Sequence, residues 1–147
     1  FVSTEGHSMY GLLHPDTTVE DLVSGPGLVR VWTQIHGQIE GGPSLDDAEI
    51  SDWVVANAGR DPFATEVSQV FRSALVDASV ALSLRLGVKR ALFMGGVVQG
   101  WARHLTETGS WAQLERRAGC TVGLIQHPYP ALLGAGRVGR SLIDDAS

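Results

Sequence analysis

The chain has 147 residues, 44% of them hydrophobic, and a formal net charge of -5 at pH 7. This size and apolar content suit one folded domain, or a large part of one, and exclude a disordered or fibrous chain. Its 11 lysines and arginines form no cluster, so we expect no nucleic-acid partner and no anionic membrane partner. The single cysteine, Cys120, excludes a disulfide framework within these residues and is predicted to be a buried packing residue.

The expected location is cytoplasmic. A chain with one cysteine is typical of a reducing compartment. No apolar stretch is expected to span a membrane, and no basic-then-apolar leader precedes the first residue. The first residue is Phe1 rather than methionine, which is consistent with a natural start further upstream.

The first part of the chain predicts an irregular start followed by helices. Residues 1–17 show no sustained period and are predicted to be a strand end and a loop. Ser24 is predicted to cap a helix that ends at residues 41–43, where two glycines precede a proline. A short helix follows, with Ser51 as its N-cap and Gly59 as its end.

The longest predicted helix begins with Asp61 as its cap, has Pro62 at the first helical position and ends before Gly87. One face of this helix is apolar at intervals of three and four residues, which predicts packing against a sheet or another helix. The residues of that face are Phe63, Val67, Val70, Phe71, Ala74, Leu75, Ala78, Ala81 and Leu82.

The rest of the chain alternates strands with helices, which is typical of an α/β layer fold with crossover connections. The predicted elements are a strand over 88–94, helices over 100–108 and 111–118, a strand over 120–126 and a helix from 131 onward. The two or three strands are few for so many helices, so we expect part of the sheet to be missing.

Two glycines follow the first of these strands directly. Gly95 and Gly96 have no Cβ, so they can adopt dihedrals closed to other residues and leave room for a nucleotide base or ribose. Ligands of open α/β sheets bind at the carboxyl ends of the strands. The alternative is that the pair serves only the strand-to-helix connection, where glycine is common.

Three motifs occur in a set order along the chain. Residues 24–29 read Ser-Gly-Pro-Gly-Leu-Val, residues 92–98 read Leu-Phe-Met-Gly-Gly-Val-Val, and residues 132–136 read Leu-Leu-Gly-Ala-Gly. Together with the long helix, this order resembles the C-terminal part of bacterial-type glucokinases, which belong to the sugar kinase, actin and heat-shock ATPase superfamily. The resemblance covers residues 4–137.

The resemblance implies a fold and an activity. The fold is α/β, helix-rich, with the ribonuclease H-like core of a sugar kinase, and residues 1–147 would be the C-terminal part of its large domain. The activity is transfer of the γ-phosphate of ATP to the 6-hydroxyl of glucose. ATP and Mg²⁺ are the implied cofactors, glucose is the implied substrate, and a homodimer is left open.

The resemblance also implies roles for individual residues. The Thr-Glu-Gly-His sequence near the start resembles a family segment with one more glycine, so Glu5 and His7 are candidate glucose ligands. Gly95 and Gly96 match the glycine pair laid against the adenosine of ATP, and Gly134 matches a helix start near the same pocket. The alternatives are solvation for the first two residues and close helix packing for Gly134.

The catalytic motifs of that family do not occur in these 147 residues. They are an Asp-x-Gly-Gly-Thr phosphate loop, an Asn-Asp pair whose aspartate takes the sugar hydroxyl proton, and a Gly-Thr-Gly turn. Phosphoryl transfer needs an oriented nucleophile, a base and support for the moving charge. We therefore expect the chain to be inactive alone and to depend on a missing N-terminal segment.

Two further readings stay open at this point. One is a sugar- or nucleotide-sensing module that kept the scaffold without catalysis, and the other is a structural α/β domain whose glycines serve packing alone. A metal site is not expected, because the histidines lack ligand spacing and are predicted to be surface or capping residues. These histidines are His14, His36, His104 and His127.

Overall fold

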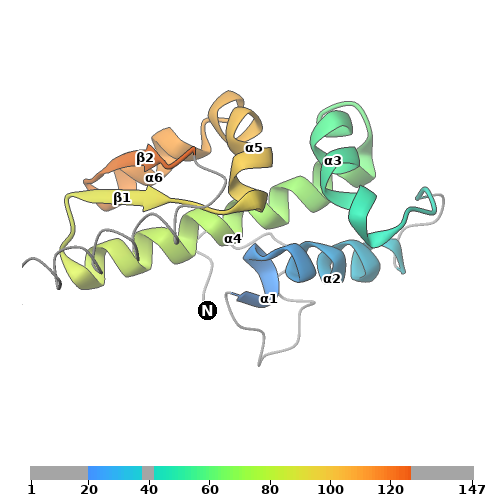
Figure 1. Ribbon diagram of the computed structural model, residues 1–147, viewed down its shortest axis with the longest axis horizontal. Coiled ribbons are helices and arrows are strands. Elements are labelled where there is room, and N and C mark those ends of the chain that lie inside the picture. The colour runs from blue at the N-terminus through green and yellow to red at the C-terminus, as the bar shows by residue number, and fades with distance from the viewer. Residues whose placement is uncertain (1–19, 38–41, 127–147) are drawn as a thin grey trace, which may run out of the picture.

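The computed structural model describes residues 20–37 and 42–126 of the chain (Figure 1). The described helices are α1 (Glu20–Val23), α2 (Gly25–His36), α3 (Asp47–Asn57), α4 (Pro62–Leu86), α5 (Gly96–Glu107) and α6 (Ser110–Ala118). Strands β1 (Arg90–Phe93) and β2 (Thr121–Leu124) form a two-stranded parallel sheet. The described part is therefore a helix-rich α/β layer, as the alternation of elements predicted.

Helix α4 is the longest element and lies along the molecule, with other helices packed against it (Figure 1). Its bounds agree with the prediction because both ends have a local signal. At the start, the Asp61 carboxylate accepts from the backbone N–H of Ala64 at 2.9 Å, and Pro62 follows it. At the end, Gly87 has a φ of 62°, a left-handed conformation that favours glycine. Helices α2, α3 and α6 pack against α4.

The buried face of α4 differs from the predicted one in its last turns. Ala81 and Leu82 are exposed, Leu82 by 58%. In their place, Val76 and Val80 are buried and pack with Leu114 of α6. The prediction extended one stripe along the whole helix, but α6 approaches from a different side than α2 and α3, so the buried stripe turns around the helix axis.

Three other predicted helix bounds were wrong. Helix α2 ends at His36, before residues 41–43, because Gly37 follows it and glycine is a poor helix former. Helix α3 begins at Asp47 rather than after Ser51, since the N–H of Asp46 donates to the Glu49 carboxylate at 3.1 Å in a capping box. Helix α5 begins at residue 96 rather than 100.

Trp101 fixes α5 on the rest of the core. Its side chain is fully buried, and its ring lies against Phe71 of α4 with 4.3 Å between centroids. Its indole N–H donates to the Ser51 hydroxyl of α3 at 2.9 Å. This bond explains why Ser51 lies inside α3 and does not cap it. One side chain thus ties α5 to two other helices.

Helix α4 is also long and apolar enough to cross a membrane, by length and composition, which the sequence-based expectation had missed. Half of its most apolar window is buried within the structure. A buried core helix passes the same test, so one such helix is weak evidence for a membrane span.

A partly buried ion pair joins α4 to α6. Arg117 Nη1 donates to Asp77 Oδ1 at 2.7 Å, and the Asp77 side chain is only 9% exposed. Hydrogen bonds between charged groups contribute more to stability than neutral ones. An exposed pair, Arg103 with Glu107, offers a comparison within α5.

We predict that Asp77→Ala lowers the free energy of unfolding by about 1.5–3 kcal/mol, because it removes a charged hydrogen bond between α4 and α6. The matched control Glu107→Ala, in the exposed pair, should lower it by about 0.3–0.5 kcal/mol. Urea denaturation of both variants measures the two values. Equal losses in the two variants would show that the Asp77 pair contributes no more to the free energy of unfolding than the exposed pair.

Candidate functional site

The chain turns sharply at the carboxyl end of β1. Gly95 has φ 111° and ψ 158°, a combination that only glycine adopts readily. A Cβ atom placed on Gly95 or on Gly96 would meet nothing within 4 Å. Bare backbone therefore faces open space at this end of the strand. No described side chain fills that surface, and β1 has a parallel neighbour, as the interpretation of this turn requires.

The turn leads into the N-terminus of α5 without a side-chain cap. The first bond of the helix runs from the N–H of Gln99 to the carbonyl of Gly95 at 3.0 Å. The N–H groups of the preceding helical residues have no intrahelical acceptor, as at every helix start. With the positive end of the helix dipole, such a terminus favours an anionic group beside it.

Gln99 joins this helix start to the end of β2. Its Nε2 donates to the carbonyl of Ile125 at 3.2 Å, and the N–H of Ile125 donates to the carbonyl of Phe93 at 2.9 Å. Because the two strands are parallel, both end at the same edge, and Gln99 lies across that edge. This is the position in which open α/β sheets take ligands.

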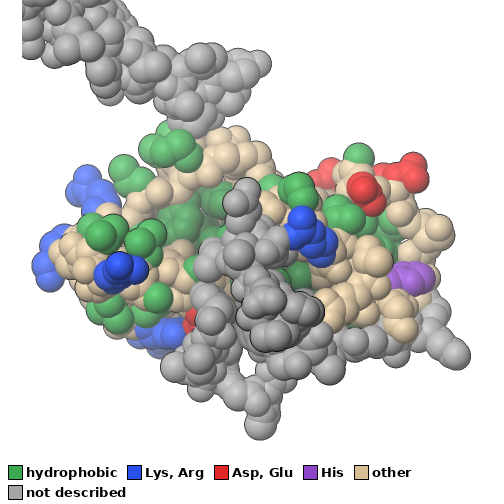
Figure 2. All heavy atoms as spheres, turned by 90° about the horizontal axis from the view of Figure 1, so that it is seen from below, with side chains coloured by type: hydrophobic (Ala, Val, Ile, Leu, Met, Phe, Trp, Pro, Cys, Tyr) green, Lys and Arg blue, Asp and Glu red, His purple; other side chains and the backbone are tan. Residues whose placement is uncertain are grey.

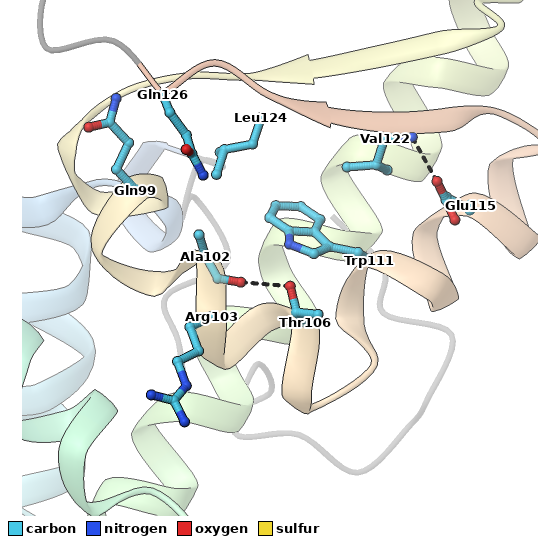
Figure 3. A pocket seen from close by; sticks show the side chains of 9 residues that line it. All are labelled: Gln99, Ala102, Arg103, Thr106, Trp111, Glu115, Val122, Leu124 and Gln126. Atoms are coloured by element: carbon cyan, nitrogen blue, oxygen red, sulfur yellow. Dashed lines mark hydrogen bonds between the residues drawn. The ribbon is translucent and has the colours of Figure 1, made fainter.

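A groove of about 520 Å³ lies next to this edge, between α5, α6 and β2. Figure 3 shows Trp111 in the middle of the groove, with Gln99 and Gln126 toward one side and Glu115 toward the other. The Trp111 ring packs on Phe93 of β1 with 4.8 Å between centroids, so the groove has a firm aromatic wall.

Sequence reasoning did not select the residues of this groove. Trp111 was only a helical residue in the prediction, although an aromatic next to a polar cluster is a common wall of a binding site. Gln99 and Gln126 offered one usable signal, because each follows the end of a strand by a few residues. Glu115 accepts from the N–H of Val122 at 2.9 Å and so belongs to the wall as well.

The Ser-Gly-Pro-Gly turn serves as a helix cap, as predicted. The Ser24 hydroxyl accepts from the N–H of Gly27 at 3.0 Å. A Cβ on Gly25 would lie 3.8 Å from the Val97 side chain, so the start of α2 packs directly against the first turn of α5. This turn therefore helps to hold the first turn of α5 in place.

A buried polar network holds the middle of α5 on α4. Ser68, which is 1% exposed, has its Oγ 2.7 Å from Nε2 of His104 and accepts from Nε of Arg72 at 3.2 Å. Burial, followed by the charge of Arg72, lowers the pKa of His104 below its ordinary 6.5, while Glu107 acts in the opposite direction. Burial also lowers the pKa of Arg72. The hydroxyl of Ser68 can therefore donate to a neutral imidazole.

Comparison with known proteins identifies the lineage of the chain. The sequence profile of the glucokinase family matches residues 14–141. The chain belongs to the glucokinase family. A glucokinase of Aromatoleum aromaticum (strain DSM 19018 / LMG 30748 / EbN1) is 32% identical over 130 residues, which cover 80% of this chain and 38% of that protein. The chain thus spans less than half the length of this relative. No solved structure matches the chain.

The match confirms the resemblance to bacterial-type glucokinases. Of the predicted site residues, the structure places Gly95 and Gly96 at the edge of the sheet. Glu5, His7 and Gly134 lie outside the described residues. The ligand roles of all five residues stay predictions.

The described residues contain no group of three or more His, Cys, Asp or Glu side chains that could hold a metal ion. Cys120 is buried, which confirms its predicted packing role. His104 differs from its predicted surface or capping role, because it is partly buried and bonded to Ser68 across two helices.

The lowered pKa of His104 predicts a pH dependence of stability. The folded chain binds this proton less tightly than the unfolded chain, so the network stabilises the fold above about pH 6.5 and loses that effect as pH falls. We expect the free energy of unfolding to fall more steeply from pH 7.5 to 5.5 in the wild type than in His104→Gln.

Urea denaturation at a series of pH values measures this difference, because the neutral glutamine removes the titration of the imidazole. The same slope in both proteins would mean that His104 titrates equally in the folded and unfolded chains.

Proposed function

We propose that this chain is part of an ATP-dependent glucokinase that moves the γ-phosphate of ATP to the 6-hydroxyl of glucose. Membership of the glucokinase family supports this reaction. The observation that supports nucleotide binding is the open Gly95–Gly96 turn beside two parallel strand ends. Residues 1–147 are the C-terminal part of the large domain, with a ribonuclease H-like core, in a cytoplasmic protein that needs neither nucleic acid nor membrane.

The described residues fit one side of a nucleotide. The Gly95–Gly96 turn leaves room for the ribose, and the free N–H groups at the start of α5 suit the first phosphate. The groove beside Gln99 and Trp111 is large enough for a base and offers amide groups and an aromatic wall. Gly134 belongs to the same proposed site. ATP supplies the phosphoryl group, and Mg²⁺ enters with it.

The sugar half of the site rests on the resemblance. Glu5 and His7 bind glucose hydroxyls in this proposal, with the carboxylate accepting from paired hydroxyls. The 147 residues contain neither the family's phosphate loop nor its Asn-Asp pair. The base that takes the sugar proton is therefore supplied by further polypeptide, and the chain alone turns over no substrate. A homodimer is compatible with this arrangement.

A second function is a sensing module that binds glucose or the nucleotide without phosphoryl transfer. The absence of the phosphate loop and the catalytic aspartate from the family-length polypeptide would favour it. The two functions differ in the family-length protein. A glucokinase forms glucose 6-phosphate from ATP and glucose, whereas a sensor shows binding heat with either ligand and no product.

A valine at position 96 tests the nucleotide half. Gly96→Val puts a side chain into the open space beside the turn, and we expect it to weaken binding of Mg²⁺–ATP at least about tenfold, a loss of about 1.4 kcal/mol. Gly100→Val is the matched control, because Gly100 lies one turn further along α5 and also faces open space. Isothermal titration calorimetry measures both. Equal affinities for the two variants would remove the turn from the nucleotide site.

A glutamine at position 5 tests the sugar half. In the family-length enzyme, Glu5→Gln keeps the size of the side chain but removes the charge that strengthens hydrogen bonds from hydroxyls. We expect the KM for glucose to rise about tenfold while the KM for ATP stays unchanged. Steady-state kinetics with each substrate varied in turn measure the two KM values. An unchanged KM for glucose would take Glu5 out of the sugar site.

A further inference from the structure

Arg72 of α4 and Arg117 of α6 are partly buried, in contrast to the other Lys and Arg side chains of the described part. Those others are exposed, and Figure 2 shows several Lys and Arg side chains that project from one end of the molecule. Water solvates an exposed cation, which therefore needs no counter-ion. A charge that leaves water is normally paired with an opposite charge. Arg72 and Arg117 are therefore the arginines for which a counter-ion is expected.

Arg117 has such a counter-ion, whereas Arg72 has none within residues 20–37 and 42–126. The Asp77 carboxylate accepts from Arg117 at 2.7 Å. The other described ion pair joins Arg103 to Glu107, so no described carboxylate pairs with Arg72. Burial lowers the pKa of Arg72, which is the direction expected for a cation that has lost water and gained no anion. The two partly buried arginines thus differ in one respect, and an anion beside Arg72 would remove the difference.

The guanidinium of Arg72 is held in one orientation by a buried hydroxyl. Its Nε donates to Oγ of Ser68 at 3.2 Å, and Ser68 is 1% exposed. The same Oγ lies 2.7 Å from Nε2 of His104, which accepts the hydroxyl proton when the imidazole is neutral. The guanidinium is planar, and its two Nη groups make no hydrogen bond to another described residue. One edge of the group is therefore anchored, while its outer end remains available.

We propose that the two Nη groups of Arg72 bind a carboxylate. Two parallel N–H donors of a guanidinium match the two oxygens of a carboxylate, and such bidentate pairs are strong. The site carries one positive charge, because a neutral His104 adds none. A carboxylate balances that charge, whereas a doubly charged phosphate would leave an excess negative charge in a partly desolvated place. The partner is thus a small carboxylic acid, or an aspartate or glutamate of further polypeptide.

This site is separate from the groove at the strand ends. His104 lies eight residues after Gly96, which is about 12 Å further along α5. The lining of the groove includes neither Arg72 nor His104. The proposal therefore does not depend on nucleotide binding. A bound carboxylate acts instead at the contact between α4 and α5, where it offsets the cost of burying the guanidinium.

The titration of His104 reports on this site. Burial and then the charge of Arg72 lower the pKa of His104, while Glu107 raises it. An anion that compensates Arg72 should therefore raise the pKa of His104 toward its ordinary value. An NMR titration of the full chain in sodium acetate measures this pKa. Sodium chloride at the same ionic strength is the control, because salt alone screens the charge of Arg72.

Three variants assign the effect to the guanidinium. Arg72→Met keeps the apolar stem without the charge, and we expect it to weaken acetate binding at least about tenfold. Arg72→Lys keeps the charge without the two parallel donors, so it should also weaken binding. Arg85→Met removes one exposed charge from the same helix and should leave both acetate binding and the response of His104 unchanged. Isothermal titration calorimetry measures the affinities, and circular dichroism verifies that each variant is folded.

The proposal is overturned if acetate and chloride give the same pKa of His104 in the wild type, a comparison that requires no variant. It is also overturned if Arg72→Met binds acetate as tightly as the wild type, or if phosphate at the same free concentration binds more tightly than acetate. The source of the carboxylate follows from the family-length protein. A response to acetate there identifies a small acid, whereas a response confined to the 147-residue chain assigns the carboxylate to further polypeptide.

Discussion

The contact between α5 and α4 is the constraint on which the candidate site depends. Trp101 is buried between Phe71 and Ser51, and the Ser68–His104 bond holds the same helix one turn further on. Because α5 cannot rotate or slide without breaking these contacts, its first turn stays at the edge of the sheet. The open backbone at that edge is a product of core packing, since the glycines themselves have no side chain that could position them.

Family membership and local geometry support different parts of the functional conclusion. The glucokinase match covers most of the chain and shows its lineage, but the chain covers 38% of the Aromatoleum relative. The geometry shows a ligand-sized groove and an uncapped helix start at parallel strand ends. The proposed nucleotide-binding role of this part of the chain rests on both observations.

The sequence-based predictions were accurate where the signal lies within the element itself and failed where it comes from residues far away in the sequence. Helix α4 was predicted to the residue because Asp61 and Gly87 act through their immediate neighbours. The start of α5 was missed because Gly95 caps it with backbone alone, and a glycine pair does not show where a helix begins. Ser51 looked like a cap but binds Trp101, which lies 50 residues away in sequence. The turned face of α4 depends on α6, and no periodicity within α4 could reveal that. The groove was missed for the same reason, since its walls come from three elements.

The carboxylate of Glu115 makes the two edges of the sheet differ in how readily they can pair with a further strand. By accepting from the N–H of Val122, it occupies a donor that a neighbouring strand would need. A strand added beside β2 would have to displace this charged group from its hydrogen bond, which costs free energy. Glu115 therefore opposes the addition of a strand beside β2, and a further strand would pair more easily beside β1. A strand paired there would make β1 an interior strand and hold the glycine turn that follows it more rigidly than two strands alone can.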